Sequence, residues 1–300
     1  MKLLRVAVHF HLYYMDLLDK YLEKMSLLSN SKCFFTIYLT SSVVNNDSEQ
    51  GKLNHKLVQT SLDKYNLANK CKIITVPNIG YDIGPFVHVI NSIDLDSYDL
   101  VLKIHTKNEK GSNVTALNGV NYTDKDWSEL LIDSVLKNKS TISKIFSIFK
   151  KNLDVNMVSS KYCTTSDEFY YKKHIKKVNE ILNKISLPAV ESIEFCAGTI
   201  FWARTSIFKL IQNKYTIESF VDSRNNMSDI DCTLAHTFER LFGVLANSNN
   251  GKIKKIAYRN LKKEAIEILK DYSRFFYENR ETEKKHTIKV LRINIYKRLK

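Results

Sequence analysis

Polar side chains that could bind a ligand follow three apolar segments in the first third of the chain. In chain order they are His9 and His11, then Asn78, Gly80 and Asp82, then His105 and Lys107. Carboxylate and imidazole groups serve as acids and bases in catalysis, and an ammonium group can neutralise an anion. These residue types indicate a ligand-binding site, provided that the chain brings the three groups together.

The loop 77–86 is the stretch around which the chain is organised. It contains two of the chain's three prolines and two of its eight glycines. Glycine permits positive φ and proline restricts φ, so this composition indicates a fixed backbone path. The loop follows the apolar residues 73–76 and precedes a predicted helix, which is where α/β sheets bind ligands. Asp82 in this loop fits a ligand-binding role and a helix-capping role equally well.

Strand and helix patterns alternate along most of the chain, which predicts a mostly parallel sheet flanked by helices. The predicted strands are 3–12, 33–39, 71–76, 98–104, 155–159, 195–203 and 253–258. The predicted helices are 16–28, 53–66, 85–93, 124–136, 140–151, 168–185, 205–213, 231–245 and 261–279. Residues 108–124 form a polar loop long enough to be a functional lid.

The cysteines and the apolar segments favour a cytosolic protein. Five widely spaced cysteines without a CxxC pair favour reduced thiols over disulfides or a zinc site. No apolar run approaches the roughly 18 residues of a membrane span, and the N-terminal residues resemble a strand rather than a signal peptide.

Positive charge is concentrated at the C-terminus. Residues 252–300 hold 16 Lys or Arg and 6 Asp or Glu, which gives +10 of the chain's net charge of +14. A nearly balanced core with a basic extension fits an anionic membrane surface, with residues 284–300 as the contact. It argues against nucleic-acid binding, for which no recognisable module is present.

Four blocks of residues, in order over about residues 3–245, resemble the rhamnan synthesis protein F family of bacterial polysaccharide glycosyltransferases. They are His9-x-His11-x-Tyr13; Asn78 to Phe86; Tyr98-Asp99-x-Val101-Leu102-Lys103-x-His105-Thr106-Lys107; and Ala197 to Arg204 together with Asp231 to Phe242. The chain departs from the family pattern at Cys232, where glycine is usual, and the resemblance does not cover the basic extension.

The resemblance implies a GT-A-like domain over residues 1–250. The residues that follow, 251–300, lie outside the resemblance and are expected to form a helical basic extension. Residues 1–107 would bind the nucleotide-sugar, and residues 108–250 would supply the acceptor and catalytic half. The implied reaction transfers a sugar, L-rhamnose from dTDP-rhamnose, with inversion onto a growing glycan that is lipid-linked. The implied location is the cytoplasmic face of the membrane, with the protein peripheral to it.

The resemblance also assigns roles to residues. Asp231 is the expected catalytic base, and Asp82 is its rival. The residues expected to bind the donor are His9, His11, Asn78, Gly80, Asp82, His105, Lys107 and Arg240. Trp202, Arg204, His236 and Glu239 are expected to form the wall beside the sugar or acceptor. Three alternatives stay open: Trp202 and His236 as core residues, and Glu239 with Arg240 as an internal ion pair.

A divalent metal, Mn²⁺ or Mg²⁺, is expected to be dispensable, and no metal ligands are assigned. In the GT-A-like fold a DxD pair at the end of the fourth strand holds the metal, whereas here that strand ends in His105-Thr106-Lys107. Of the three DxD triplets, 94–96 lies at the wrong edge of the sheet and 124–126 fits a helix cap. Only 229–231 competes as a functional triplet.

Two other functions remain as alternatives to glycosyl transfer. One is a basic nucleic-acid-binding protein, and the other is an inactive scaffold of a polysaccharide-assembly complex. Retention of all four blocks disfavours the scaffold.

Overall fold

The computed structural model divides the chain into two units, residues 1–257 and 258–300, and each is described by itself. The structure describes residues 3–45, 47–111, 114–117, 120–166, 168–224, 233–257, 277–282, 285–290 and 293–299.

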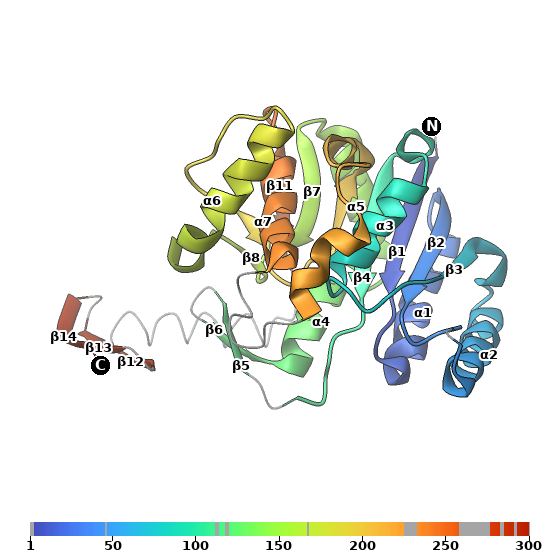
Figure 1. Ribbon diagram of the computed structural model, residues 1–300, viewed down its shortest axis with the longest axis horizontal. Coiled ribbons are helices and arrows are strands. Elements are labelled where there is room, and N and C mark those ends of the chain that lie inside the picture. The colour runs from blue at the N-terminus through green and yellow to red at the C-terminus, as the bar shows by residue number, and fades with distance from the viewer. Residues whose placement is uncertain are drawn as a thin grey trace. The chain divides into compact units, whose positions relative to one another are not determined.

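The first unit is built on one seven-stranded sheet with the strand order β11-β7-β10-β4-β1-β2-β3 (Figure 1). Its strands are β1 (Leu4–His11), β2 (Cys33–Ser41), β3 (Cys71–Thr75), β4 (Leu100–His105), β7 (Val155–Ser160), β10 (Phe201–Arg204) and β11 (Lys252–Ile256). Neighbouring strands are parallel except at β10, which is antiparallel to both β4 and β7. The predicted mostly parallel sheet is therefore confirmed. The strand order reverses between β1 and β4, where open α/β sheets form a crevice for ligands.

Helices flank this sheet, as the sequence predicts. They are α1 (Leu18–Ser26), α2 (Glu49–Lys64), α3 (Ile83–Ser92), α4 (Asp124–Leu136), α5 (Lys139–Lys151), α6 (Glu168–Lys184) and α7 (Leu234–Asn247). Short 3₁₀ segments occupy Met15–Leu17, Leu27–Asn30, Ala68–Lys70, Leu95–Ser97, Thr205–Leu210 and Ile217–Arg224. The predicted helix 205–213 is thus a 3₁₀ segment that ends at Leu210.

Alternating side chains of β10 show which helices cover which face. Phe201 makes edge-to-face contacts with Phe86 of α3 and Phe242 of α7. The next residue, Trp202, donates a hydrogen bond to the carbonyl of Val135 in α4 at 3.0 Å. Because successive strand residues point to opposite faces, α3 and α7 cover one face and α4 covers the other. In Figure 1, α3 and α7 lie in front of the sheet.

The predicted strand 195–203 is interrupted. Phe195–Cys196 form β9, which pairs with β8 (Thr164–Thr165), and the chain then turns before β10 begins at Phe201. Gly198 and Thr199 in this turn have φ of +86° and +48°. Left-handed residues cannot continue a strand, so the turn separates β9 from β10.

The predicted lid contains a hairpin, β5 (Val114–Leu117) with β6 (Val120–Thr123). Residues 252–256, which the sequence assigned to the extension, form β11 and pair with β7 in the main sheet.

The second unit contains a three-stranded antiparallel sheet of β12 (Tyr277–Thr282), β13 (Lys285–Val290) and β14 (Ile293–Leu299). The expected helical character of the extension is therefore wrong for these residues. The apolar residues Ile293, Ile295 and Leu299 lie an even number of positions apart, a spacing that suits a strand. Pairing of β14 with β13 makes this segment a strand rather than a helix. The predicted helix 261–279 otherwise lies outside the described residues. Within the described ranges, no helix is both long and apolar enough to cross a membrane.

Candidate functional site

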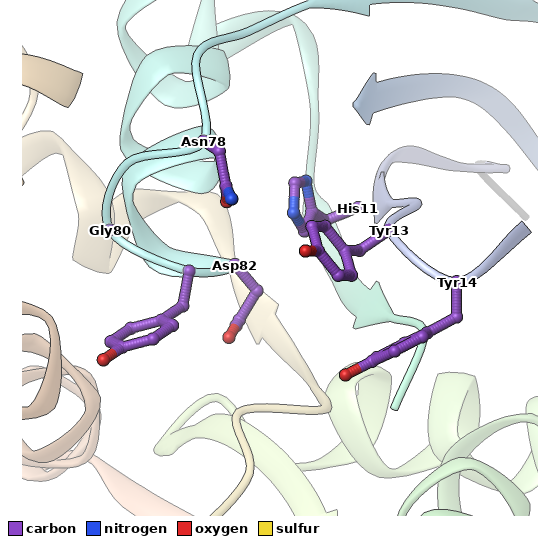
Figure 2. A pocket seen from close by; sticks show the side chains of 7 residues that line it. His11, Tyr13, Tyr14, Asn78, Gly80 and Asp82 are labelled. Carbon is purple, nitrogen blue, oxygen red and sulfur yellow. The ribbon is translucent and has the colours of Figure 1, made fainter. Parts of the chain in front are cut away.

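A pocket of about 410 Å³ lies where β1 and β3 end, beside the reversal of strand order. It is lined by His11, Tyr13, Tyr14, Asn78, Gly80, Tyr81 and Asp82. In Figure 2 the side chains of His11, Asn78 and Asp82 gather around one space between the end of β1 and the loop after β3. A groove of about 530 Å³ adjoins it along the ends of β1, β2 and β3, and the two share Tyr13 and Asn78. His11, from the first predicted group, and the second predicted group of Asn78, Gly80 and Asp82 therefore meet at one edge of the sheet.

The loop 77–86 reaches this pocket through two left-handed residues, Gly80 (φ +74°) and Tyr81 (φ +54°). A Cβ on Gly80 would lie 2.7 Å from Cβ of Phe220, so only glycine fits there. The amides of Ile83 and Gly84 donate to the carbonyl of Gly80 at 3.0 and 2.9 Å, which begins α3. Asp82 occupies the N-cap position, but its side chain makes no capping hydrogen bond. The capping interpretation of Asp82 is therefore wrong.

The Asp82 carboxylate instead forms an ion pair with Lys103, in the middle of β4. Lys103 is 0% exposed, and its ammonium also donates to the hydroxyl and the carbonyl of Thr199 at 2.9 and 3.2 Å. The Thr199 hydroxyl in turn donates to Oδ2 of Asp82 at 2.6 Å. Each ammonium proton thus has an acceptor, which is what a fully buried lysine needs to stay charged.

Thr199 reaches Asp82 only because the turn between β9 and β10 adopts left-handed conformations. A β-branched residue at φ +48° costs about 1–3 kcal/mol, and such strain tends to gather at functional sites. The turn is held by Glu239 of α7, whose carboxylate accepts a hydrogen bond from the amide of Gly198 at 2.7 Å. Glu239 also forms an ion pair with Arg240. This pair supports the turn rather than facing the pocket.

Charges around Asp82 keep it ionised. Burial alone would raise the pKa of Asp82, but the Lys103 ammonium and the hydrogen bonds from Lys103 and Thr199 outweigh burial and hold that pKa well below its ordinary value. Burial lowers the pKa of Lys103, and the Asp82 carboxylate opposes this shift. The Asp82 carboxylate is therefore ionised at neutral pH and, like the two oxygens of Thr199, it accepts a hydrogen bond from the Lys103 ammonium.

The histidines of the site are neutral at physiological pH. Burial lowers the pKa of His11 to about 4 and that of His105 to about 3, and it holds the pKa of His9 well below its ordinary value. The ring nitrogens of His9 and His11 share the Thr40 hydroxyl, at 2.9 and 3.1 Å. His105 lies with Nδ1 3.4 Å from Asp82 Oδ2. His11 is the one histidine among these that lines the pocket.

Lys107, the expected diphosphate ligand, lies with its ammonium 4.0 Å from the ring centroid of Trp127 in α4. It does not belong to the residues that line the two pockets at this edge. His236 of α7 packs edge-on against Tyr81, with ring centroids 5.6 Å apart, and shares a hydrogen bond with Thr233. Arg240 is buried, with its guanidinium 4.6 Å from the Phe195 ring.

Trp202 and Arg204 do not form the predicted sugar wall. Trp202 is 0% exposed and packs against Phe146 on the α4 face. Arg204 pairs with Leu100, the first residue of β4, so it lies at the edge of the sheet opposite the pocket. There it donates to three carbonyls at 2.7 to 3.1 Å. The Trp202 assignment fails because alternation along β10 points this side chain to the α4 face. The Arg204 assignment fails because β10 runs antiparallel to β4, which carries the end of β10 away from the site.

Asp231, the expected base, and the triplet 229–231 lie outside the described residues. Within the described part of the chain, no group of three or more His, Cys, Asp or Glu is placed to hold a metal ion. Mn²⁺ and Mg²⁺ favour clusters of oxygen ligands, whereas Asp82 Oδ2 is already occupied by an ammonium and a hydroxyl. The described residues at this edge do not fit a divalent metal.

Sequence reasoning gave no role to Lys103 or Thr199. Lys103 did carry a signal, because it is the single charge within the apolar strand residues 100–104. A lysine there is costly unless a carboxylate meets it, and Asp82 is the partner that the loop supplies. Thr199 carried no comparable signal, since its left-handed conformation cannot be recognised from its residue type.

Two sequence comparisons bear on the chain as a whole. The model of the family described as rhamnan synthesis protein F matches residues 1–250. The protein WxcX, an uncharacterized protein of Xanthomonas campestris pv. campestris strain B100, is 22% identical over 256 residues. That alignment covers 82% of this chain and 32% of WxcX, so the chain spans about a third of that relative's length.

Solved structures of low similarity were also found. Glucosyl-3-phosphoglycerate synthase from Mycobacterium tuberculosis, in complex with Mn²⁺, UDP and glucosyl-3-phosphoglycerate, is 10% identical with a TM-score of 0.33 and covers 99% of this chain and 90% of its own. Mannosyl-3-phosphoglycerate synthase from Rubrobacter xylanophilus is 11% identical with a TM-score of 0.38, and the match covers 96% of this chain and 84% of the synthase chain. These values are too low to carry an argument about activity.

Proposed function

Because the chain belongs to the rhamnan synthesis protein F family, we propose that it is a polysaccharide glycosyltransferase that uses a nucleotide-sugar donor. The observation that carries the proposal is the pocket with its adjoining groove at the ends of β1, β2 and β3, with the Asp82 carboxylate facing the pocket. The groove and the pocket are joined through Tyr13 and Asn78, so one elongated ligand can occupy both. A nucleotide-sugar has this elongated shape.

The donor that we propose is dTDP-L-rhamnose, and the acceptor is a growing glycan that is lipid-linked. In the transfer, an acceptor hydroxyl oxygen attacks the anomeric carbon as the bond from that carbon to the diphosphate oxygen breaks. The diphosphate leaves with the bonding electrons, and a carboxylate takes the hydroxyl proton. A single displacement of this kind inverts the anomeric centre. We propose Asp231 as that carboxylate.

A cation near the leaving diphosphate would stabilise its developing charge. We propose Lys107 for this role, because it follows β4 at the ligand edge and, among the described residues, its ammonium contacts the face of Trp127. On this proposal, full activity persists in excess EDTA, and Lys107→Met lowers turnover while Lys110→Met, on the same loop, does not. Strict dependence on Mn²⁺ or Mg²⁺ would contradict it.

A thermal-shift screen tests the function directly. The chain is heated with dTDP, UDP, dTDP-L-rhamnose and UDP-glucose, with and without Mn²⁺. A ligand present at about 100 times its dissociation constant stabilises the native state by about 2.7 kcal/mol, which is easily detected. Absence of any shift with all four compounds would contradict a nucleotide-sugar-binding function.

For the basic extension we propose contact with an anionic membrane surface, at the cytoplasmic face. Its net charge of +10 over residues 252–300 supports this proposal. In a flotation assay, the full chain should rise with vesicles that contain anionic lipid, whereas a chain that lacks residues 284–300 should not. Equal flotation of the two chains would contradict the proposal.

A further inference from the structure

The pocket around Asp82 has an unusual balance of charge for a site near a diphosphate. Of its seven lining residues, Asp82 alone is charged at neutral pH, because His11 has a pKa of about 4. The ammonium of Lys103 is fully buried behind Asp82 and does not line the pocket. A diphosphate placed there would face a carboxylate oxygen while the compensating ammonium stays buried behind it, and two groups that only accept hydrogen bonds have no proton to share.

The Asp82 carboxylate is turned so that its two oxygens have different surroundings. Oδ2 accepts hydrogen bonds from Lys103 and Thr199. Oδ1 has no hydrogen-bond partner among the described residues, and the side chain is 17% exposed where it lines the pocket. An ionised carboxylate oxygen accepts hydrogen bonds strongly and cannot donate one. The pocket therefore offers an acceptor to a hydroxyl group.

The other lining side chains suit a sugar ring. Tyr13 and Tyr81 are 42% and 46% exposed, so their rings present apolar surface to a ligand. The Asn78 amide can both donate and accept a hydrogen bond. Aromatic surface with a few fixed polar groups is typical of pockets for small ligands.

We propose that this pocket takes the neutral, hydroxyl-bearing glycosyl residue of the donor while the diphosphate stays outside it, and that Lys103 and Thr199 are positioning residues that keep Asp82 Oδ1 turned toward the sugar. The inference rests on the proposed function and refines it. It makes Asp82 a binding group rather than the base, since the same contacts that orient Asp82 also weaken its affinity for a proton.

Calorimetric titration of the full chain with dTDP and with dTDP-L-rhamnose tests the assignment. Asp82→Asn should weaken binding of dTDP-L-rhamnose about 10- to 100-fold, because a hydrogen bond to a charged group is lost. Binding of dTDP should change less than about twofold, since the diphosphate does not meet Asp82. Tighter binding of dTDP by the variant, or equal weakening of both compounds, would overturn the proposal.

The positioning role is tested at Thr199, which offers a matched pair of variants. Thr199→Val removes the hydroxyl and should weaken dTDP-L-rhamnose several-fold without changing dTDP. Thr199→Ser keeps the hydroxyl and should restore the wild-type affinity. If both variants bind like the wild type, Thr199 does not position Asp82. Melting temperatures confirm that each variant is folded.

A second measurement separates this inference from the proposed function. If the wild type binds none of the nucleotides, saturation-transfer NMR with methyl α-L-rhamnopyranoside and methyl α-D-glucopyranoside probes the pocket alone. If saturation transfer to either sugar is seen with the wild type and is lost in Asp82→Asn, the pocket binds sugar. The nucleotide-sugar donor would then be wrong while the sugar pocket stands. No transfer, or equal transfer with wild type and variant, would overturn the inference itself.

Discussion

The Asp82–Lys103 ion pair allows a sharp test of how the site is held together. The perturbation is a double-mutant cycle of Asp82→Asn, Lys103→Met and the two combined. Asp82→Asn leaves an ammonium that is 0% exposed without its countercharge. Lys103→Met leaves a carboxylate that is 17% exposed, so water in the pocket can hydrate it. The two halves of the pair therefore differ in the cost of losing their partner.

The magnitudes follow from this difference. Removing one partner of a buried ion pair costs about 3–5 kcal/mol, and we expect Asp82→Asn to lie in this range. We expect Lys103→Met to cost about 2–3 kcal/mol, because the remaining carboxylate is partly hydrated. The combined variant leaves no unpaired charge, so its cost should fall below the sum by at least about 2 kcal/mol.

Urea unfolding at pH 7 measures the free energy of unfolding for all four chains. The ion pair of Lys209 with Asp96 is a matched control, since its side chains are 42% and 78% exposed. The cycle of Lys209→Met and Asp96→Asn should give a coupling below about 1 kcal/mol. Additive costs at Asp82 and Lys103, or a greater cost for Lys103→Met than for Asp82→Asn, would refute the reasoning.

Three further predictions concern single residues. The pKa of His105 is about 3 in the folded chain and about 6.5 in the unfolded chain. Between these pH values the unfolded chain binds more protons, so the free energy of unfolding falls by up to about 1.4 kcal/mol per pH unit as the pH drops. His105→Gln should flatten that slope in urea unfolding between pH 7 and 4, and an unchanged slope would contradict it. Arg204→Ala should lower stability by about 2 kcal/mol through three lost hydrogen bonds, yet leave nucleotide-sugar affinity unchanged in titration. Asp231→Asn should reduce turnover about 10²- to 10⁴-fold with donor affinity intact, whereas turnover within a few-fold of wild type would exclude it as the base.

Local patterns in the sequence predicted the framework of the site. Strand–helix alternation predicted the parallel sheet, and the proline and glycine content of loop 77–86 predicted a fixed backbone path. Both are local properties that hydrophobic spacing and backbone sterics determine. The end of β1 and the loop after β3 meet for the same reason, because parallel strands end at the same edge of a sheet.

The parts that could not be predicted depend on contacts between distant segments. Asp82 meets Lys103 because α3 leads the chain from β3 across the sheet to β4. Thr199 joins them because β10 is antiparallel beside β4. The same strand direction carries Arg204 to the opposite edge of the sheet, and alternation along β10 places Trp202 on the α4 face. The residue types alone reveal neither.

The antiparallel strand of the seven-stranded sheet, β10, also has a consequence for how the chain can be divided. Since β10 pairs with β4 on the side away from β1, a fragment ending at residue 107 would leave β4 as an uncovered edge with Lys103 exposed on it. All six residues of β4 are buried in the whole chain, and uncovered apolar edges tend to pair with other molecules. A hybrid that exchanges residues 1–107 between relatives would therefore have to carry a matching β10 and its Thr199 turn. We therefore expect a hybrid exchanged at this boundary alone to be less stable than either parent chain.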